Sequence, residues 1–454
     1  MDSRRLNVLM VPWLAYGHIS PFLELAKNLV DKNFSIHICS SAINLNSIKQ
    51  KLVNENHHRS IQLVDLQLPS TPDLPPNHHT TNGLPPHLMS TLRSAFETAA
   101  PSFSHILGTL KPDLVIYDYS SPWVPAAAAE HNIPAVQFLT VGASMVSFGL
   151  SMMKNPNKEY PFPEINLRNI RRLRMRGATD SPKEEGSNKD GSRFIESMER
   201  SSEIILVKTF REIEGKYIDY FSDLVKKKIV PVGPLIEEQV GLLDERNTEI
   251  AQWLDKKDKS SSIFVSFGSE CFLTKEEIEE VAHGLELSKV NFIWVLRFPG
   301  GEKVRVDEVL PEGFLENVGE KGMVVEGWAP QVQILAHPSI GGFVSHCGWS
   351  SIMESMSFWV PIIALPMHLD QPLNARLVEA VGVSIEVKRG ENGELKRDEI
   401  GEVIRKVVVE KDGEEVRNKA RNLKDVLKSK GDEEICEVAK ELLQLCRNGT
   451  DNGI

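Results

Sequence analysis

The stretch "NVLMVPWLAYGHISPFLELAKNLVDKNFSIHICS", residues 7–40, contains the pattern that decides the fold. Residues 7–13 form a short apolar run without a charge, which is typical of a strand buried on both faces. Residues 20–33 carry apolar side chains at helical spacing, and residues 34–40 form a second strand-like run. A strand, a helix and a strand in this order predict one unit of a parallel sheet covered by helices.

The same alternation continues through both halves of the chain. In the first half, further strand-like runs are "IQLVDLQL", "PDLVIYDY" and "PAVQFLT". A second series has a helical pattern at 274–288 and strand-like runs at 262–269, 291–297, 322–328, 341–347 and 361–366. The chain is therefore expected to be an α/β protein with two Rossmann-like domains that face each other across a cleft. Ligands of such sheets bind outside the carboxyl ends of the strands.

The pattern also predicts the domain boundaries. We expect an N-terminal domain at 1–236, a linker at 237–250 and a second domain at 251–434. Residues 435–454 carry one apolar stripe at helical spacing, which predicts a C-terminal helix and tail that dock back on the first domain. Residues 154–193 are rich in charged and small polar side chains and are expected to be an irregular insertion.

The composition is that of a globular protein. Of 454 residues, 41% are hydrophobic and 25% charged, and the net charge of -11 disfavours a binder of nucleic acid or of an anionic membrane. The five cysteines are never spaced C-x-x-C, which predicts reduced thiols in the cytoplasm. The uncharged stretch 132–153 contains Pro134 and Gly142, so we expect a strand and a buried helix there rather than a membrane span. A soluble cytoplasmic protein is expected.

A helix start is predicted in "VSHCGWSSIMES", residues 344–355. Gly348 permits a tight turn after a strand, and Ser350 or Ser351 can cap the helix that follows. The spacing from Ser351 to Glu354 is that of a capping box. A helix that begins at the carboxyl end of a strand offers unpaired N–H groups, which is a natural site for phosphate.

His346 and Cys347 in this stretch allow two other interpretations, a metal site and a catalytic Cys–His pair. No partner cluster of ligands accompanies them at a metal-binding spacing, so no metal site is expected. Neighbouring side chains of a strand point to opposite faces, which disfavours the catalytic pair. Cys347 is expected to be a small buried hydrophobic residue, and the phosphate interpretation is favoured.

The longer stretch "WAPQVQILAHPSIGGFVSHCGWSSIMESMSFWVPIIALPMHLDQ", residues 328–371, resembles the 44-residue signature box of plant family 1 UDP-sugar glycosyltransferases. Its length and the placement of W, APQ, H, CGW, S, E, P and DQ all agree with that box. The segments "YGHISP", "IYDYSSPW" and "FVSFGS" extend the resemblance over nearly the whole chain. The resemblance implies the twin-Rossmann GT-B fold, with the UDP-sugar as a co-substrate and no cofactor or required metal.

The resemblance also implies the residues that bind the donor. Trp328 would stack on the uracil, with Ala329 and Gln331 at the base and ribose, and Glu354 would bind the ribose hydroxyls. This role for Glu354 competes with the capping box. The diphosphate and sugar contacts would come from Ser269, His346, Trp349, Ser350, Ser351, Asp370 and Gln371.

The chain departs from the family pattern at three positions in the box. Ser350 stands where the family usually has Asn, Leu365 where Trp is common, and Trp359 where Gly is common. Together with "PMHLDQPLNARL", these variants resemble the branch that adds a sugar to an existing sugar of a glycoside. A glutamine at the last box position, here Gln371, is similar to members that use glucose.

A catalytic base for glycosyl transfer is predicted in the first half of the chain. His18 lies in an expected loop before a helix that Ser20 and Pro21 would begin, and Asp118 ends the strand-like run "PDLVIYD". Both follow strands of one domain, so they could meet at the carboxyl edge of the sheet. Removing a hydroxyl proton requires a base, and a carboxylate on the second ring nitrogen would orient the imidazole. The resemblance assigns these parts to His18 and Asp118.

The expected function is inverting transfer of glucose from UDP-glucose to a small lipophilic plant metabolite, at a sugar hydroxyl of a terpenoid or flavonoid glycoside. Transfer to an aglycone hydroxyl and a non-catalytic nucleotide-sugar binder are the alternatives. A Rossmann dehydrogenase is disfavoured, because no G-x-G-x-x-G is present. The protein is expected to be a monomer without stable membrane insertion. Acceptor contacts are expected from Trp13, Tyr16, Phe138 and Thr140.

Overall fold

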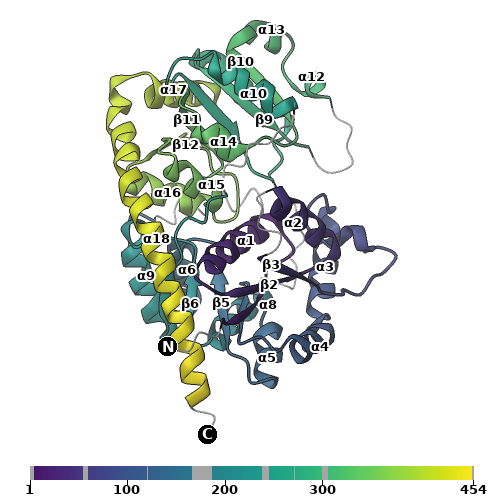
Figure 1. Ribbon diagram of the computed structural model, residues 1–454. Helices are drawn as coiled ribbons and strands as arrows, with labels where there is room; N and C mark the ends of the chain where they lie inside the picture. The colour runs from purple at the N-terminus through teal and green to yellow at the C-terminus, as the bar shows by residue number, and fades with distance from the viewer. Residues whose placement is uncertain are drawn as a thin grey trace. The chain divides into compact units, whose positions relative to one another are not determined.

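The chain forms two compact units in the computed structural model (Figure 1). The structure describes residues 5–54, 60–119, 121–165, 187–237, 245–269, 271–298 and 305–451. The first unit takes in the described parts of 1–151, 183–240 and 429–454, and the second those of 152–182 and 241–428.

The first unit is built on a parallel sheet of seven strands in the order β3-β2-β1-β4-β5-β6-β7. Most of its strands are buried along their length, which explains why they are uninterrupted apolar runs. The strands are β1 (Asn7–Val11), β2 (Ser35–Ser40), β3 (Ile61–Asp65), β4 (Leu114–Tyr117), β5 (Ala135–Leu139), β6 (Ile204–Val207) and β7 (Lys228–Pro231).

Helices cover both faces of this sheet. One hydrophobic core joins the sheet to α1 (Tyr16–Asp31), α2 (Ala42–Asn54) and the last part of α18 (Glu414–Asp451). A second core on the other face joins it to α3 (Met89–Glu97), α4 (Ala100–Leu110) and α5 (Trp123–Glu130), as Figure 1 shows. The remaining helices are α6 (Ala143–Lys154), α8 (Ser187–Arg200) and α9 (Arg211–Val225), with short 3-10 turns at Pro76–His78 and Pro86–Leu88.

The second unit is built on a parallel sheet of six strands in the order β10-β9-β8-β11-β12-β13. The strands are β8 (Ser262–Ser266), β9 (Asn291–Leu296), β10 (Gly322–Glu326), β11 (Ile340–Ser345), β12 (Ile362–Ala364) and β13 (Ser384–Glu386). One face packs on α11 (Lys275–Ser288) and α17 (Arg397–Val408), the other on α10 (Glu245–Asp255) and α14 (Gln331–Ala336). The other helices are α12 (Val306–Val309), α13 (Phe314–Val318), α15 (Trp349–Ser357) and α16 (Gln371–Val381), with 3-10 turns at Gly319–Lys321 and Lys411–Gly413.

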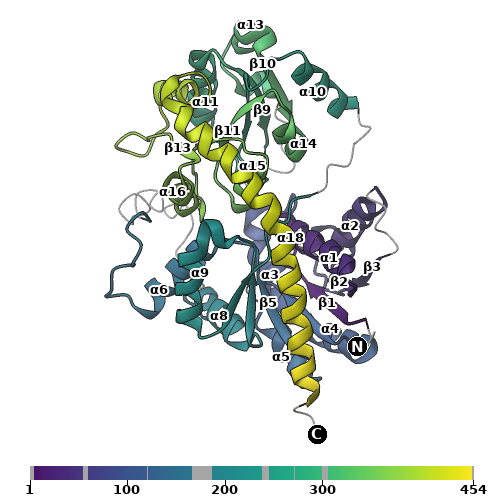
Figure 2. The same cartoon turned by 60° about the vertical axis from the view of Figure 1, so that its left-hand side comes forward.

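Helix α18 is one continuous helix, as Figure 2 shows. Its first part is counted with the second unit and its last part with the first unit. Ile435, Val438 and Leu442 lie in the same core as the buried side chains of α1 and β1. The apolar stripe at the end of the chain therefore packs on the first sheet.

The predicted α/β fold with two Rossmann-like parallel sheets is confirmed. Helix α10 begins at Glu245, inside the predicted linker 237–250, and residues 238–244 lie outside the described residues, so the linker stays a prediction. The expected irregular insertion is wrong for 187–193, which belong to α8, while 166–186 are not described. Strands β6, β7 and β13 were not predicted, since their apolar runs are short.

Candidate active site

His18 lies in the first turn of α1, directly after β1. Ala15 precedes the helix in an extended conformation, and its carbonyl accepts hydrogen bonds from the N–H groups of His18 at 3.0 Å and Ile19 at 2.9 Å. The predicted helix start at Ser20 and Pro21 is therefore wrong, because both residues lie inside α1. The absent N–H of Pro21 removes only one helical hydrogen bond near the helix start, which the packed helix tolerates.

His18 and Asp118 meet because β1 and β4 are neighbours. The two strands pair in parallel with Val11 opposite Tyr117, so both end at the same edge of the sheet. The Nδ1 atom of His18 lies 2.9 Å from Oδ2 and 3.1 Å from Oδ1 of Asp118. This is the hydrogen bond that would orient a catalytic imidazole.

The carboxylate of Asp118 is fully buried and held in one orientation. The backbone N–H of Trp13 donates to Oδ2 at 2.8 Å, and the N–H of Tyr119 donates to Oδ1 at 2.7 Å. The ring of Tyr119 stacks on the imidazole of His18, and Thr140 Oγ1 lies 3.2 Å from Nδ1. With Nδ1–H donating to Asp118, the basic lone pair of a neutral imidazole is on Nε2.

Of the four residues expected to contact the acceptor, two lie beside the His18–Asp118 pair, one is exposed in α1 and one is buried in the core. Thr140 lies against His18, and Trp13 lies beside Asp118 with its ring packed edge-on against Phe96. Tyr16 is 46% exposed in the first turn of α1. Phe138 has no exposed surface and lies in the hydrophobic core of the first unit, so the structure does not place it where it could contact an acceptor.

In the second unit, the expected uracil and ribose residues Trp328, Ala329 and Gln331 lie where β10 ends and α14 begins, and Glu354 lies in α15. Trp328 is 48% exposed, whereas Ala329 is buried. Gln331 is the first residue of α14, and its Nε2 donates to Ser351 Oγ at 3.0 Å and to Glu354 Oε2 at 2.6 Å. Gln331, Ser351 and Glu354 therefore form one hydrogen-bonded group.

The predicted capping box is wrong. Helix α15 begins at Trp349 with Gly348 as its N-cap, and no side chain caps it. Neither Ser350 nor Ser351 is the cap, and the oxygens of Ser351 and Glu354 accept from the glutamine of α14 instead. The N-cap residue Gly348 makes no side-chain cap hydrogen bond, and the positive end of a helix favours an anion at this position.

The turn before α15 differs from the expected one. Cys347, not Gly348, has the left-handed conformation, with φ of 65° against -61° for Gly348. A Cβ atom on Gly348 would collide with the imidazole of His346, and one on Gly268 would lie 2.7 Å from His346 Nε2. Both glycines are therefore needed for close approach to this imidazole. Cys347 is fully buried, which confirms its prediction as a packing residue.

His346 is a neutral donor rather than a cation. Burial, and then repulsion from His368, lower the pKa of His346 to about 4. Near neutral pH, the imidazole can therefore donate a hydrogen bond to a phosphate but contributes no charge. Ser269 is exposed three residues after β8, which pairs with the strand that precedes His346.

The turn that carries the expected sugar-binding residues is fixed from two sides. Gln371 Oε1 accepts from the N–H groups of Met367 and His368, each at 3.0 Å. Arg389 donates to the carbonyl of Pro366 at 3.0 Å. Because the carbonyl oxygen of Gln371 is used inside the turn, its amide nitrogen is the part suited to donate to a ligand.

Asp370 is tied to the turn before α15. Asn374 Nδ2 donates to Asp370 Oδ2 at 2.8 Å and to the carbonyl of Cys347 at 3.0 Å. Trp349 is only 4% exposed. One buried asparagine thus joins the segment that begins α15 to the segment that begins α16.

The sequence did not indicate Asn374 or Arg389. Both are polar residues outside the signature box, and nothing in their spacing distinguishes them from surface residues. Trp359, by contrast, could be singled out in the sequence, because it stands where glycine is common in the related family. Its φ of 50° is a left-handed conformation that favours glycine, the residue that the related family usually has there.

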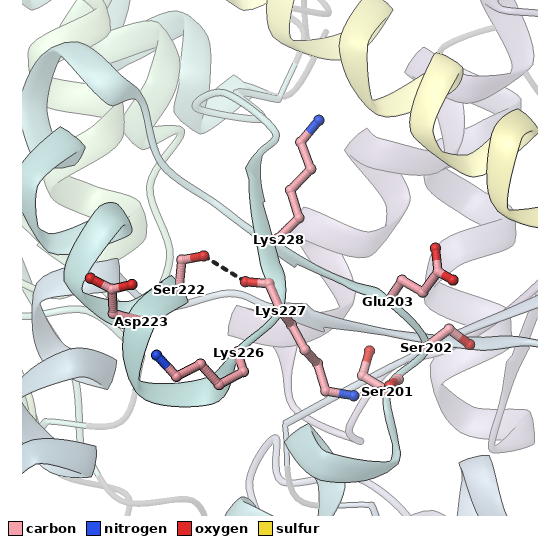
Figure 3. Close-up of a pocket in the computed structure, with 8 residues that line it drawn as sticks. All are labelled: Ser201, Ser202, Glu203, Ser222, Asp223, Lys226, Lys227 and Lys228. Carbon is pink, nitrogen blue, oxygen red and sulfur yellow. Dashed lines mark hydrogen bonds between the residues drawn. The ribbon is translucent and has the colours of Figure 1, made fainter.

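A hollow on the opposite edge of the first sheet is not part of this site (Figure 3). It lies at the amino ends of β6 and β7, whereas His18 follows the carboxyl end of β1. Lys227 donates to the carbonyls of Glu199 and Ser201, and Lys228 pairs with Glu441 at 2.8 Å. These two cations already have partners within the protein.

No group of three or more His, Cys, Asp or Glu side chains is arranged to hold a metal ion in the part of the chain that the structure describes. Within the same residues, every helix is too short or too polar to cross a membrane.

Known proteins resemble the chain along its whole length. Residues 4–237 match the family "Glycosyltransferase, N-terminal domain", and residues 242–416 match "UDP-glucoronosyl and UDP-glucosyl transferase". UDP-glucosyltransferase 29 of Panax ginseng is 55% identical over 99% of this chain and 100% of its own. Beta-D-glucosyl crocetin beta-1,6-glucosyltransferase of Gardenia jasminoides is 52% identical over 98% of this chain and 100% of its own.

A solved structure shares the fold. A Glycyrrhiza uralensis glycosyltransferase complexed with glycyrrhetinic acid 3-O-monoglucuronide superposes with a TM-score of 0.84 at 23% identity. The match covers 99% of this chain and 98% of that one.

Proposed function

The chain belongs to the family of UDP-glucoronosyl and UDP-glucosyl transferases, and from that premise we propose that it moves glucose from UDP-glucose to a sugar hydroxyl of a terpenoid or flavonoid glycoside. The UDP-sugar is a co-substrate, and the second substrate is a small molecule. Which hydroxyl accepts the sugar is part of the proposal.

The observation that carries the choice of acceptor is the relative from Gardenia jasminoides. Its name describes an acceptor, beta-D-glucosyl crocetin, that already bears glucose, and it is 52% identical to this chain. Variants in the signature box, among them Ser350 and Trp359, favour the same branch of sugar-extending enzymes. Transfer to an aglycone remains the alternative.

His18 would act as the base. Nε2 takes the proton of the acceptor hydroxyl while the oxygen attacks the anomeric carbon of the glucose, and the bond from that carbon to the UDP oxygen breaks. Attack on the face opposite the UDP inverts the anomeric carbon. Asp118 would hold the tautomer with Nδ1–H and stabilise the imidazolium that forms. Trp13, Tyr16 and Thr140 lie next to this pair or in its helix, and would contact the acceptor.

The second unit would hold the donor. Trp328 would stack on the uracil, Ala329 would contact the base through its main chain, and Glu354, held by Gln331, would bind the ribose hydroxyls. The negative charge that develops on the diphosphate would be stabilised by the N–H groups at the start of α15. The side chains that contact the diphosphate and the glucose would be those of Ser269, His346, Ser350, Ser351, Trp349, Asp370 and Gln371.

The remaining expectations concern the protein as a whole. We propose that it acts in the cytoplasm, as a monomer, without stable insertion in a membrane. The net charge of -11 is consistent with weak attraction to anionic lipid surfaces.

The proposal is tested by assaying UDP-glucose with matched pairs of acceptors, each an aglycone and its monoglucoside. We expect transfer to the monoglucosides, with two glucose units in one chain on the product. Transfer to aglycones alone would overturn the sugar-extending assignment. Binding of UDP-glucose without transfer to any acceptor of the panel would favour the non-catalytic alternative.

A further inference from the structure

Helix α6 begins three residues after Thr140, the residue whose hydroxyl lies 3.2 Å from His18 Nδ1. The residue before the helix is Gly142, which has no side chain to cap it. The first N–H groups of a helix need acceptors when they are buried, and Ala143 and Ser144 have no exposed surface. Their acceptor must therefore come from elsewhere in the chain.

That acceptor is Glu214 of α9. Its Oε2 accepts from the N–H of Ala143 at 2.8 Å and its Oε1 accepts from the N–H of Ser144 at 2.8 Å. The carboxylate is fully buried, and each of its oxygens accepts a hydrogen bond from the start of α6. A carboxylate here also lies at the positive end of the helix dipole, which stabilises it.

The backbone of α9 is distorted at this residue. Glu214 has φ of -119° and ψ of 16° inside the helix, and α9 is kinked there. Burying a carboxylate costs several kcal/mol unless hydrogen bonds offset the loss of water. Burial raises the pKa of Glu214, and hydrogen bonds that it accepts from Ser144, Thr209 and Ala143 oppose this effect. The kink of α9 therefore coincides with the buried acid that binds the start of α6.

The short segment from Thr140 to Ser144 is therefore held at both ends. At one end its threonine contacts the imidazole of His18, and at the other its backbone is bound by Glu214. Small displacements of catalytic groups change rates strongly, because the reacting atoms must be aligned. A residue that fixes this segment can therefore affect the base without contacting it.

We propose that Glu214 is a positioning residue for glycosyl transfer: it fixes the start of α6 and thereby holds Thr140 against His18. The inference rests on the proposed role of His18 as the base. Glu214 itself contacts neither substrate.

The test compares Glu214→Gln with the parent protein. Glutamine keeps the shape, but its NH2 group faces an N–H donor of α6, so one hydrogen bond is lost and Thr140 moves. We expect kcat to fall by about 10- to 100-fold, with the KM for UDP-glucose unchanged because the donor residues lie in the other unit. Glu212→Gln, an exposed substitution two residues earlier on the same helix, is the matched control and should leave kcat unchanged.

A double-mutant cycle separates positioning from a general loss of stability. If Glu214 acts through Thr140, then Glu214→Gln should cause little further loss of kcat in a Thr140→Val background. Independent, multiplicative losses would overturn the proposal, as would a folded Glu214→Gln protein with the parent kcat and pH profile. A variant with a lowered Tm but the parent kcat would show a purely structural role.

A second measurement does not depend on turnover. The NMR chemical shifts of the His18 imidazole should change in Glu214→Gln and should change in the same direction in Thr140→Val. If no acceptor is glucosylated even by the parent protein, the proposed function fails while these chemical shifts still decide the role of Glu214. Unchanged chemical shifts of His18 in Glu214→Gln would contradict the proposal.

Discussion

Nδ1 of His18 lies 2.9 Å from Oδ2 of Asp118, although the two residues are 100 positions apart in the chain. The contact exists because β1 and β4 are adjacent parallel strands that end at one edge of the sheet. The carboxylate is fully buried and bound by two backbone N–H groups, so the imidazole has a fixed partner.

The first prediction concerns Asp118→Asn. An asparagine would place an NH2 group against the N–H of Trp13 or Tyr119, and its remaining oxygen could not hold the imidazole in the same way. We expect kcat to fall by about 10²–10⁴-fold, because the wrong tautomer of His18 is favoured. Steady-state kinetics measure this, and an unchanged kcat in a folded variant would show that Asp118 does not orient the base.

The second prediction concerns Gly348→Ala. The backbone of Gly348 has an ordinary φ of -61°, so alanine adds no backbone strain, and only its Cβ pressing on His346 is new. Displacing the imidazole should remove its hydrogen bond to the phosphate, worth ~1.5–3 kcal/mol, so binding of UDP-glucose should weaken by about tenfold or more. Calorimetry measures the affinity. Gly149→Ala, where nothing lies within 4 Å of the added methyl, should bind UDP-glucose as the parent does; equal affinity in both variants would contradict the role of His346.

The third prediction concerns Arg389→Ala. Arg389 holds the turn that precedes Asp370 and Gln371, and it lies away from Trp328 in sequence and in strand order. Loss of the guanidinium should raise the KM for UDP-glucose by about tenfold and leave inhibition by UDP unchanged. The exposed neighbour Lys388 provides the control variant, Lys388→Ala. Equal weakening of UDP and UDP-glucose would show that Arg389 does not act on the sugar end.

The fourth prediction concerns Glu434 and pH. Burial, and then repulsion from Glu212, raise the pKa of Glu434 to about 8, from an ordinary value of 4.5 in the unfolded chain. The unfolded chain therefore releases this proton first, and the stability that Glu434 contributes is lost as the pH rises from 4.5 to 8. Glu434→Gln should raise the free energy of unfolding at pH 8 and change it less at pH 5.

Urea unfolding at the two pH values measures this effect. Asp432→Asn, an exposed substitution on the same helix, should leave the pH dependence of stability unchanged. If the parent and Glu434→Gln lost the same free energy of unfolding as the pH rises, the raised pKa of Glu434 would be contradicted.

The fold and the pair His18–Asp118 could be predicted because both depend on the ends of buried strands. Such strands are short apolar runs, and polar residues just after them must gather at one edge of a parallel sheet. The start of α1 could not be predicted from Ser20 and Pro21, since the helix begins where Ala15 ends the extended segment. The N-cap residue Ala15 makes no side-chain cap hydrogen bond, so no local signal marked this start.

The long-range hydrogen bonds that position the site residues were the hardest features to predict from the sequence. Ser351 and Glu354 have the spacing of a capping box, yet both accept from Gln331, 20 and 23 residues away. Glu214 caps α6, although the two are 71 positions apart in the chain. From the sequence, an acid in a charged helix would be predicted to be exposed to solvent. Long-range partners such as these leave no mark in the local pattern.

The most direct test of the account is His18→Ala, measured for both transfer and binding. We predict that kcat with a glucoside acceptor falls by about 10²–10⁴-fold while the calorimetric affinity for UDP-glucose stays that of the parent, because the donor residues belong to the other unit. Turnover at the parent rate would contradict the assignment of His18 as the base.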